Sequence, residues 1–334
     1  MPALTETIHI DTYTNSKELP PLLEGSILHS TEMFRSIEKR RNSTPYMLVA
    51  RDGEGKEVAH ILIIRTIRFH ILPLTFSCRY TINGEGAYSP ECNREKIFSH
   101  FIDKITETFT SSYSVIEIQN IEDSRFAYGT LSKHGFTPFR DQRIYISLHS
   151  KAPQERLTRS YKAHIRKAES NGVTLRRATS NEEIQEALHL MRNYYMSKTR
   201  HRLPDSRVLQ EILHDTCGNL SEKAKLFIVS YKEKIIGSSI CLYDKERANL
   251  AYSCGLRKSY PMQFPGIMAI WAAITDAHSN GYAHFEFLEA RGLSTFHAKF
   301  INTLLNYGGK QKGTVRWYRF KWNWLNKILH AIYV

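Results

Sequence analysis

One carboxylate in the second half of the chain is well placed for acid–base chemistry. Glu286 lies in "AHFEFLEA" between Phe285 and Phe287, so strand alternation would put it on the face opposite both phenylalanines. A carboxylate on that face could take the proton from an attacking amine, as a general base does. His297 could do the same, because imidazoles titrate near neutral pH. With fifteen histidines in the chain, an ordinary packing or surface role for His297 stays open.

Positive charge gathers at the middle of the chain. The segment "RSYKAHIRKAESNGVTLRRA" (159–178) holds six lysines and arginines. On a helix Lys162 and Arg166 share one face, where they could contact the phosphates of a polyanion or simply be solvated. Arg200, in "MSKTRHRLP", could bind a carboxylate or phosphate through its guanidinium, or be a surface arginine.

The elements that must position these residues occur twice. Residues 45–64 and 225–256 are typical of strands joined by tight turns. Each group is followed by a helix, with apolar residues at helical spacing in 94–109, and then by a further strand. We therefore predict an α/β (α+β) fold of two similar domains, residues 1–150 and 151–334, with the basic segment opening the second domain as a helix and then a strand.

Several motifs occur along the chain in a fixed order. They are "SYKAHIRKAESNGVTL", "MSKTRHRLP", "FPGIMAIWAAITDAHSNGYAHFEFLEA" and "GLSTFHAKF" (292–300). A strand group followed by a helix that points its N-terminus at a ligand is the layout of the GNAT acyltransferase fold. In order and spacing the motifs resemble those of the FemABX peptidyltransferases and related FemAB-like acyltransferases, and the likeness covers most of the chain. The resemblance implies two tandem GNAT-like domains, each a mixed β-sheet flanked by helices.

This resemblance implies an acyl- or aminoacyltransferase that forms an amide on an amine acceptor, without a covalent enzyme intermediate. In "GLSTFHAKF" the family has a lysine where His297 stands, and Lys299 lies two positions on. Tyr252, Arg257 and Tyr260 surround the end of the strand where acceptor and donor should meet. The candidate catalytic residues are Glu286, His297, Lys299 and Tyr252, and the candidate substrate-binding residues are Arg200, Arg257, Tyr260, Lys162 and Arg166.

The donor is expected at the start of the long helix in the second half. "QFPGIM" puts Gln263 and Gly266 in register with a phosphate-binding loop, and Pro265 suits a first helical turn. Met268 replaces a small residue, and we expect it to crowd an approaching phosphate. A plain turn is the alternative. The co-substrate is an acyl-CoA or an aminoacyl-tRNA, and no tightly bound cofactor is expected.

Composition limits the partners and the compartment. The formal net charge of +13 favours an anionic partner such as nucleic acid, phosphate or an acidic membrane face. The family resemblance implies that this partner is tRNA or a CoA ester. The five cysteines form no CxxC pair and no metal-binding spacing with histidine, which indicates free thiols, no metal and a reducing compartment. Without a signal-peptide pattern at the start, we expect a cytoplasmic protein. The family suggests a cell-wall or envelope precursor, which can be membrane-linked, as the acceptor.

The C-terminal stretch is basic and aromatic. Residues 310–334 hold six basic residues, no acidic ones and three of the four tryptophans. Such a segment could lie as a helix on the inner face of an anionic membrane, stack on single-stranded nucleic acid, or close the domain as a packed helix. This leaves a second hypothesis open: a non-catalytic GNAT-like module that binds RNA or a membrane surface.

Overall fold

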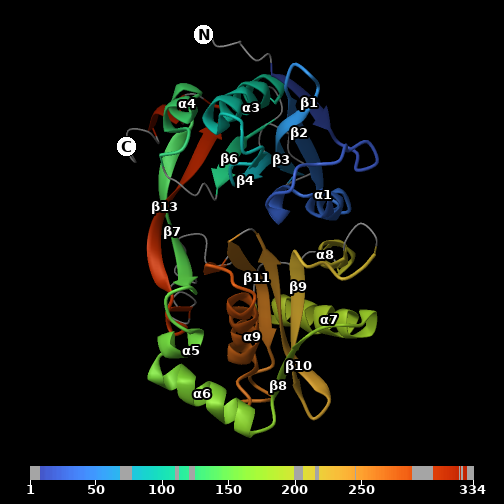
Figure 1. Ribbon diagram of the computed structural model, residues 1–334, viewed down its shortest axis with the longest axis vertical. Coiled ribbons are helices and arrows are strands. Elements are labelled where there is room, and N and C mark those ends of the chain that lie inside the picture. Colours follow the sequence, from blue (N-terminus) through green and yellow to red (C-terminus); the bar gives the residue numbers. More distant parts are fainter. Residues whose placement is uncertain are drawn as a thin grey trace. The chain divides into compact units, whose positions relative to one another are not determined.

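The computed structural model describes residues 8–67, 77–109, 113–119, 125–198, 206–214, 218–244, 246–287, 304–322, 324 and 326–328. The chain divides into two compact units (Figure 1). The first unit is Met1–Asp141 with Thr314–Val334, and the second unit is Gln142–Gly313. Strands β7 (Thr137–Ser147) and β13 (Lys310–Phe320) each contribute residues to both units.

The first unit contains an antiparallel meander, a helix and a returning strand. β2, β3 and β4 pair antiparallel in that order, and β6 then pairs parallel to β4. β1 pairs with β2, β5 with β3, and the last part of β13 with β6. The elements are β1 (His9–Tyr13), η1 (Ile27–His29), α1 (Thr31–Glu38), β2 (Ser43–Arg51), β3 (Glu57–Ile67), β4 (Cys78–Asn83), β5 (Ala87–Tyr88), α3 (Arg94–Thr108), β6 (Val115–Gln119) and α4 (Tyr128–Lys133).

Helix α3 covers the apolar face of this sheet. Asn93 caps its start by accepting the Lys96 N–H at 3.1 Å. Its apolar residues recur at helical spacing, which confirms the helix predicted over 94–109. Ile97, Phe101 and Ile105 are fully buried against strand residues such as Ile63 and Ile116.

The second unit repeats this order of elements. β9, β10 and β11 form the antiparallel meander, α9 follows, and β12 pairs parallel to β11. β8 pairs with β9 at one edge, and β7 pairs with β12 at the other. The elements are α5 (Pro153–Arg156), α6 (Arg159–Ser170), β8 (Thr174–Arg177), α7 (Asn181–Lys198), α8 (Ser206–Leu213), β9 (Ala224–Tyr231), β10 (Lys234–Tyr243), β11 (Arg247–Gly255), α9 (Pro265–Ser279) and β12 (His284–Phe287).

Helices α7 and α9 pack on opposite faces of this sheet. Two neighbouring residues of β10 show it: the Ser238 hydroxyl lies 3.5 Å from the Ala187 carbonyl of α7, and the Ser239 hydroxyl donates to the Ala269 carbonyl of α9 at 2.7 Å. α9 is almost wholly apolar, and its buried residues form the centre of the core. The predicted α/β fold with a repeated strand–helix–strand unit is thus confirmed, and so is the helix-then-strand prediction for the basic segment.

The C-terminal stretch begins as a strand, and among its described residues helix occurs only near the end, at Trp324 and 326–328. Residues Lys310–Phe320 form strand β13, which pairs antiparallel with β6 through Trp317–Phe320. Trp317 is fully buried in the core of the first unit. Among the described residues, no helix is both long and apolar enough to cross a lipid bilayer.

Candidate active site

The start of α9 forms an open backbone cradle. After β11 ends at Gly255, a compact turn follows in which the Tyr260 N–H donates to the Leu256 carbonyl at 3.0 Å. Phe264, the N-cap residue, has a left-handed backbone (φ 46°, ψ 47°) and no side-chain cap. The first N–H groups of a helix have no partner within it. Among the described residues, the amides of Gly266 and Ile267 have no acceptor, so they are available to an anion.

Glycines let α9 approach the sheet at this point. A Cβ on Gly255 would lie 2.2 Å from the Gly266 nitrogen, and one on Gly237 would lie 2.9 Å from the Pro265 carbonyl oxygen. A Cβ on Gly266, by contrast, would meet nothing within 4 Å. The expectation that Met268 crowds a phosphate is wrong, because Met268 is fully buried and its side chain belongs to the core.

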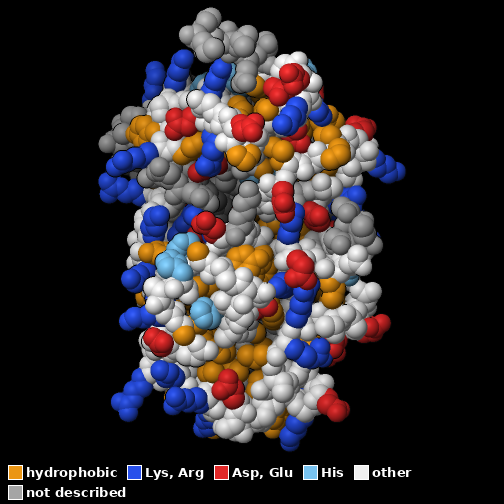
Figure 2. All heavy atoms as spheres, viewed as in Figure 1, with side chains coloured by type: hydrophobic (Ala, Val, Ile, Leu, Met, Phe, Trp, Pro, Cys, Tyr) orange, Lys and Arg blue, Asp and Glu red, His pale blue; other side chains and the backbone are white. Residues whose placement is uncertain are grey.

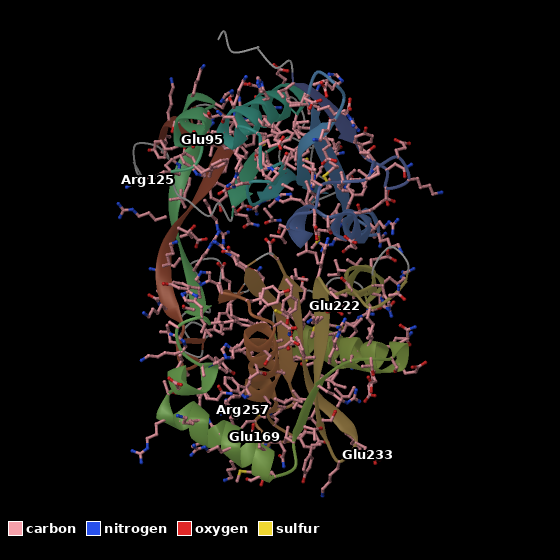
Figure 3. All side chains as sticks on the ribbon, in the orientation of Figure 1. Glu95, Arg125, Glu169, Glu222, Glu233 and Arg257 are labelled. Carbon is pink, nitrogen blue, oxygen red and sulfur yellow. The ribbon has the colours of Figure 1, made fainter. Side chains whose placement is uncertain are left out.

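Four predicted residues lie around this cradle. Gln263 and Gly266 occupy the turn and the first helical turn, and both are half-buried. Tyr260 is half-buried with its ring 6.1 Å from that of Tyr231. Arg257 is exposed in the loop between β11 and α9, where Figure 3 labels it. The structure therefore brings these residues together beside the open amides.

The basic helix α6 packs against α9. Its buried residues are Tyr161, Ile165 and Ala168, and it contacts α9 directly. Lys162 is half-buried and Arg166 is exposed, on one flank of the helix. Neither side chain forms a hydrogen bond or ion pair with any residue that the structure describes. Lysine and arginine side chains gather over this part of the surface (Figure 2).

A bulge in β11 changes the direction of its side chains. Ile240 pairs with Tyr252 but Cys241 pairs with Leu250, which leaves Ala251 as an extra residue. Leu250 therefore faces the α9 core, whereas Tyr252 faces α7, with its ring 6.1 Å from that of Tyr195. Because of the bulge, Tyr252 faces the α7 side of the sheet.

Glu286 lies on the same face, in the neighbouring strand β12. It is 6% exposed and stands opposite Asn249 of β11. Its carboxylate is held between two guanidiniums, with Arg247 Nη1 at 3.2 Å and Arg143 Nη1 at 3.6 Å. Tyr252 is three residues farther along β11 than Asn249, so Tyr252 and Glu286 are separated by about 10 Å along the strands.

His284 is a candidate that sequence reasoning missed. It lies two residues before Glu286, and therefore on the same face, with its ring 6.1 Å from Tyr145 and 5.6 Å from His149. Burial, with the positive charge of Arg247, lowers the pKa of His284 below its usual value. The same burial favours the uncharged form of the imidazole. The only sequence signal for His284 is that it stands two residues before Glu286, which puts both side chains on one face of a strand.

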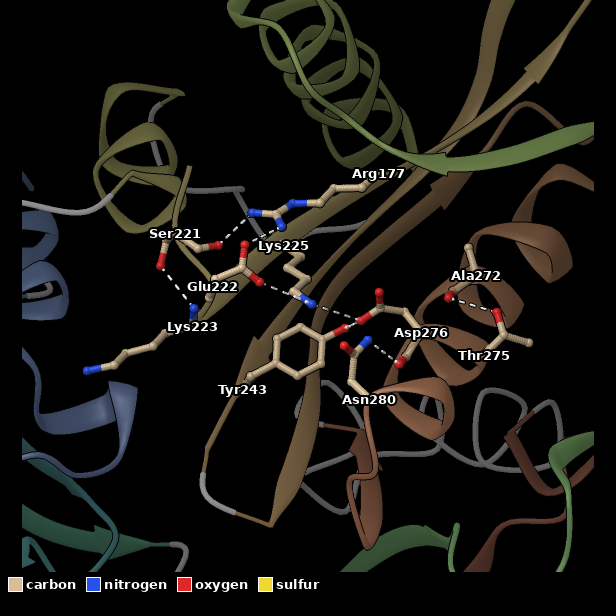
Figure 4. A network of polar contacts seen from close by, with 10 residues as sticks. All are labelled: Arg177, Ser221, Glu222, Lys223, Lys225, Tyr243, Ala272, Thr275, Asp276 and Asn280. Atoms are coloured by element: carbon tan, nitrogen blue, oxygen red, sulfur yellow. Dashed lines mark hydrogen bonds and ion pairs between the residues drawn. The ribbon is translucent and has the colours of Figure 1, made fainter. Parts of the chain in front are cut away.

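In a second polar cluster, at the other end of α9, the side chains form hydrogen bonds and ion pairs with one another (Figure 4). Lys225 is 6% exposed, and its ammonium lies 3.4 Å from Asp276 and 3.5 Å from Glu222. The Tyr243 hydroxyl donates to the same Asp276 carboxylate at 2.6 Å, and burial raises the Tyr243 pKa well above its usual value. Arg177 pairs with Glu222 at 2.6 Å. Since these groups bond to one another, the cluster joins β8, β9, β10 and α9.

Three predicted site residues, Arg200, His297 and Lys299, lie outside the described residues. Among the residues that the structure does describe, no group of three histidine, cysteine or acidic side chains could hold a metal ion.

Comparison with known proteins identifies the fold of this site. Residues 155–296 match the family model of the acetyltransferase (GNAT) domain, Acetyltransf_6. This segment is similar to a GNAT domain. The matched range contains α9, its N-terminal cradle, the β11 bulge and Glu286. No curated protein sequence matches the chain.

Solved structures extend the likeness to the whole chain. The structure titled "Crystal structure of FemX" has a TM-score of 0.66, covering 95% of this chain and 96% of that chain at 11% identity. The C-terminal domain (DUF2156) of a putative lysylphosphatidylglycerol synthetase from Agrobacterium fabrum has a TM-score of 0.58, with 92% of each chain covered at 10% identity. L-PGS from Bacillus licheniformis has a TM-score of 0.56, with 92% and 93% covered at 12% identity. The FemX-like GNAT fold expected from the sequence is confirmed.

Proposed function

We propose that this GNAT-fold protein is an acyl- or aminoacyltransferase that forms an amide on an amine acceptor by direct attack. One observation carries the proposal: the matched GNAT domain includes a helix start with open amides, directly after a bulged strand. Anionic donors bind well at such helix starts, because the helix dipole and the unbonded N–H groups both favour negative charge.

The donor's phosphates would lie against the amides of Gly266 and Ile267, near Arg257. Its acyl group would extend along β11 towards the bulge at Ala251. The amine would approach from the α7 side, where Tyr252 lies. In this arrangement the acyl group of the donor and the amine of the acceptor meet at the Ala251 bulge, and they approach it from opposite sides of β11.

A polar residue on the α7 face of the sheet would act as the general base that removes the proton from the attacking amine. Glu286 is one candidate base, although its carboxylate also serves as the partner of two arginines. His284 stands opposite Arg247, about 13 Å along the strands from the bulge, which is too far for it to take this proton. In this proposal Tyr252 would return a proton to the leaving group. Arg200, His297 and Lys299 remain part of this proposal from the family resemblance alone.

For the donor we favour aminoacyl-tRNA over acyl-CoA, because Lys162 and Arg166 add cations on the outer flank of α6, the helix that packs against α9, and their side chains have no carboxylate partners among the described residues. For the acceptor we favour an amine on a cell-wall or envelope precursor. FemX and a protein titled a putative lysylphosphatidylglycerol synthetase share the fold, which supports an acceptor of the cell envelope.

The test is a transfer assay with purified protein. Charged tRNAs and acyl-CoAs would each be offered with a panel of amines, including peptidoglycan precursors and aminolipids, and amide products identified by mass spectrometry. We expect one donor class to give product. If no donor gives product while RNA or anionic vesicles still bind, the protein is a non-catalytic binding module, as the basic tail segment also allows.

A further inference from the structure

The left-handed N-cap of α9 is supported from outside the helix. Non-glycine residues are strained in this conformation, and Phe264 has no side-chain hydrogen bond to offset the strain. The direction of the Gly266 and Ile267 amides depends on this one residue, because Phe264 sets where the chain turns into the helix. A contact that fixes the backbone conformation of Phe264 therefore also fixes the direction of the Gly266 and Ile267 N–H groups.

His164 of α6 is the side chain in contact with it. The imidazole stacks on the Phe264 ring, with the centroids 4.3 Å apart and the planes 20° from parallel. Tyr161, one turn earlier, packs beside His164 with ring centroids 6.0 Å apart. The Tyr161 ring also packs edge-on against Tyr307, whose hydroxyl donates to the Ile267 carbonyl of α9 at 3.0 Å.

The same helix holds the preceding turn. Asn171, the C-cap residue of α6, donates from its side-chain amide to the Met262 carbonyl at 3.0 Å. α6 therefore touches the backbone before the N-cap and the ring at the N-cap. Its cationic residues Lys162 and Arg166 lie on the other flank of the buried stripe, since they are about 100° and more away from Tyr161 around the helix.

We propose that His164 is a positioning residue, which locks Phe264 in its left-handed conformation and so aims the first-turn amides of α9 at the donor. The Nδ1 of His164 is buried without a hydrogen-bond partner among the described residues, so stacking is the ring's contribution at this position. The inference rests on the proposed function only for the identity of the ligand, because the positioning itself can be measured without one.

The direct test is hydrogen–deuterium exchange of the α9 start in the full chain. His164→Ala should speed exchange in the peptide 264–270 by up to about tenfold, the factor that corresponds to losing one stacked ring pair. His164→Phe keeps the stack and should restore wild-type exchange. Lys167→Ala, an exposed substitution on the same helix, is the matched control and should change nothing. Unchanged exchange in His164→Ala would overturn the proposal.

A second measurement separates positioning from general stability. With the donor that supports transfer, His164→Ala should raise the donor KM by up to about tenfold and leave kcat within about twofold, and His164→Phe should restore the KM. If no donor supports transfer, the proposed function fails, while the exchange result still decides the role of His164. An equal fall in kcat for both His164 variants would contradict a positioning role.

Discussion

Gly255 and Gly266 are in backbone contact where β11 meets the start of α9: a Cβ on Gly255 would come within 2.2 Å of the Gly266 nitrogen. Gly255 does not have a positive φ, so alanine is allowed there by its own backbone, and only the clash opposes it. We expect Gly255→Ala to lower the free energy of unfolding by at least about 1–3 kcal/mol, the usual cost of overpacking. Urea unfolding measures it, with Gly313→Ala, at a site with open space, as the control. Equal stability of the two variants would show that α9 is not seated on Gly255.

A side chain at Gly266 should cost little stability, in contrast to one at Gly255, because the space beside Gly266 is open. Gly266→Val would fit the fold but project into the cradle, so we expect a higher donor KM with little loss of stability. Gly129 is the matched control, since it is also the second residue of a helix and also has open space around it. An unchanged donor KM in Gly266→Val would place the donor elsewhere.

Much of the fold could be predicted from local patterns. The helical spacing in α3 and the repeated order of strands and helices are properties of short segments, and the structure contains them. The sequence did not predict β13, because this strand is defined by pairing with strands far away in the chain, among them β6, almost two hundred residues before it. Its buried Trp317 looked like a residue of an amphipathic tail.

The site could be predicted only in part, for the same reason. Arg257, Tyr260, Gln263 and Gly266 are close in sequence, so a local pattern could place them around the α9 start, and their role in binding stays a prediction. The Ala251 bulge was not, because a bulge is defined by the register between two strands, and it decides which face Tyr252 takes. The buried direction of Met268 was missed because it depends on how α9 rotates against the sheet.

Glu286 has two roles that one substitution can separate. Glu286→Gln keeps the shape but leaves Arg143 and Arg247 without their shared anion, so we expect a loss of about 3 kcal/mol in unfolding free energy. If the carboxylate also takes the amine's proton, the rate at saturating substrate should fall by about 100-fold or more. Arg247→Gln is the comparison, because it breaks the ion pair but keeps the carboxylate. A normal rate in Glu286→Gln would show that this carboxylate is not the base.

His29 should make the first unit sensitive to acid. It is 1% exposed and accepts the Leu62 N–H through Nδ1 at 3.0 Å, and burial, together with the nearby His60, lowers its pKa from the ordinary 6.5 to about 3. Between these values the unfolded chain binds the extra proton, so the free energy of unfolding falls as the pH drops below 6.5. We expect a loss of about 2–3 kcal/mol by about pH 4.5.

The variant that tests this is His29→Gln, which keeps an acceptor for Leu62 but cannot titrate. Its stability should fall less between pH 7 and about pH 4.5 than that of the wild type, measured by urea unfolding. His9→Gln, at an exposed position, should keep the wild-type pH dependence. A wild-type slope in His29→Gln would assign the acid sensitivity to other groups.

Lys162 and Arg166 test whether the basic helix binds a polyanionic donor. Each phosphate contact contributes about 0.7 to the salt dependence of log K for single strands and about 0.9 for duplex. Lys162→Ala with Arg166→Ala should therefore weaken tRNA binding and reduce that slope by about 1.4–1.8. Lys96→Ala with Lys133→Ala removes two exposed cations from helices of the first unit and is the matched control. Equal slopes in the two double variants would mean that α6 uses its inner face to hold the start of α9, while its outer charges are only solvated.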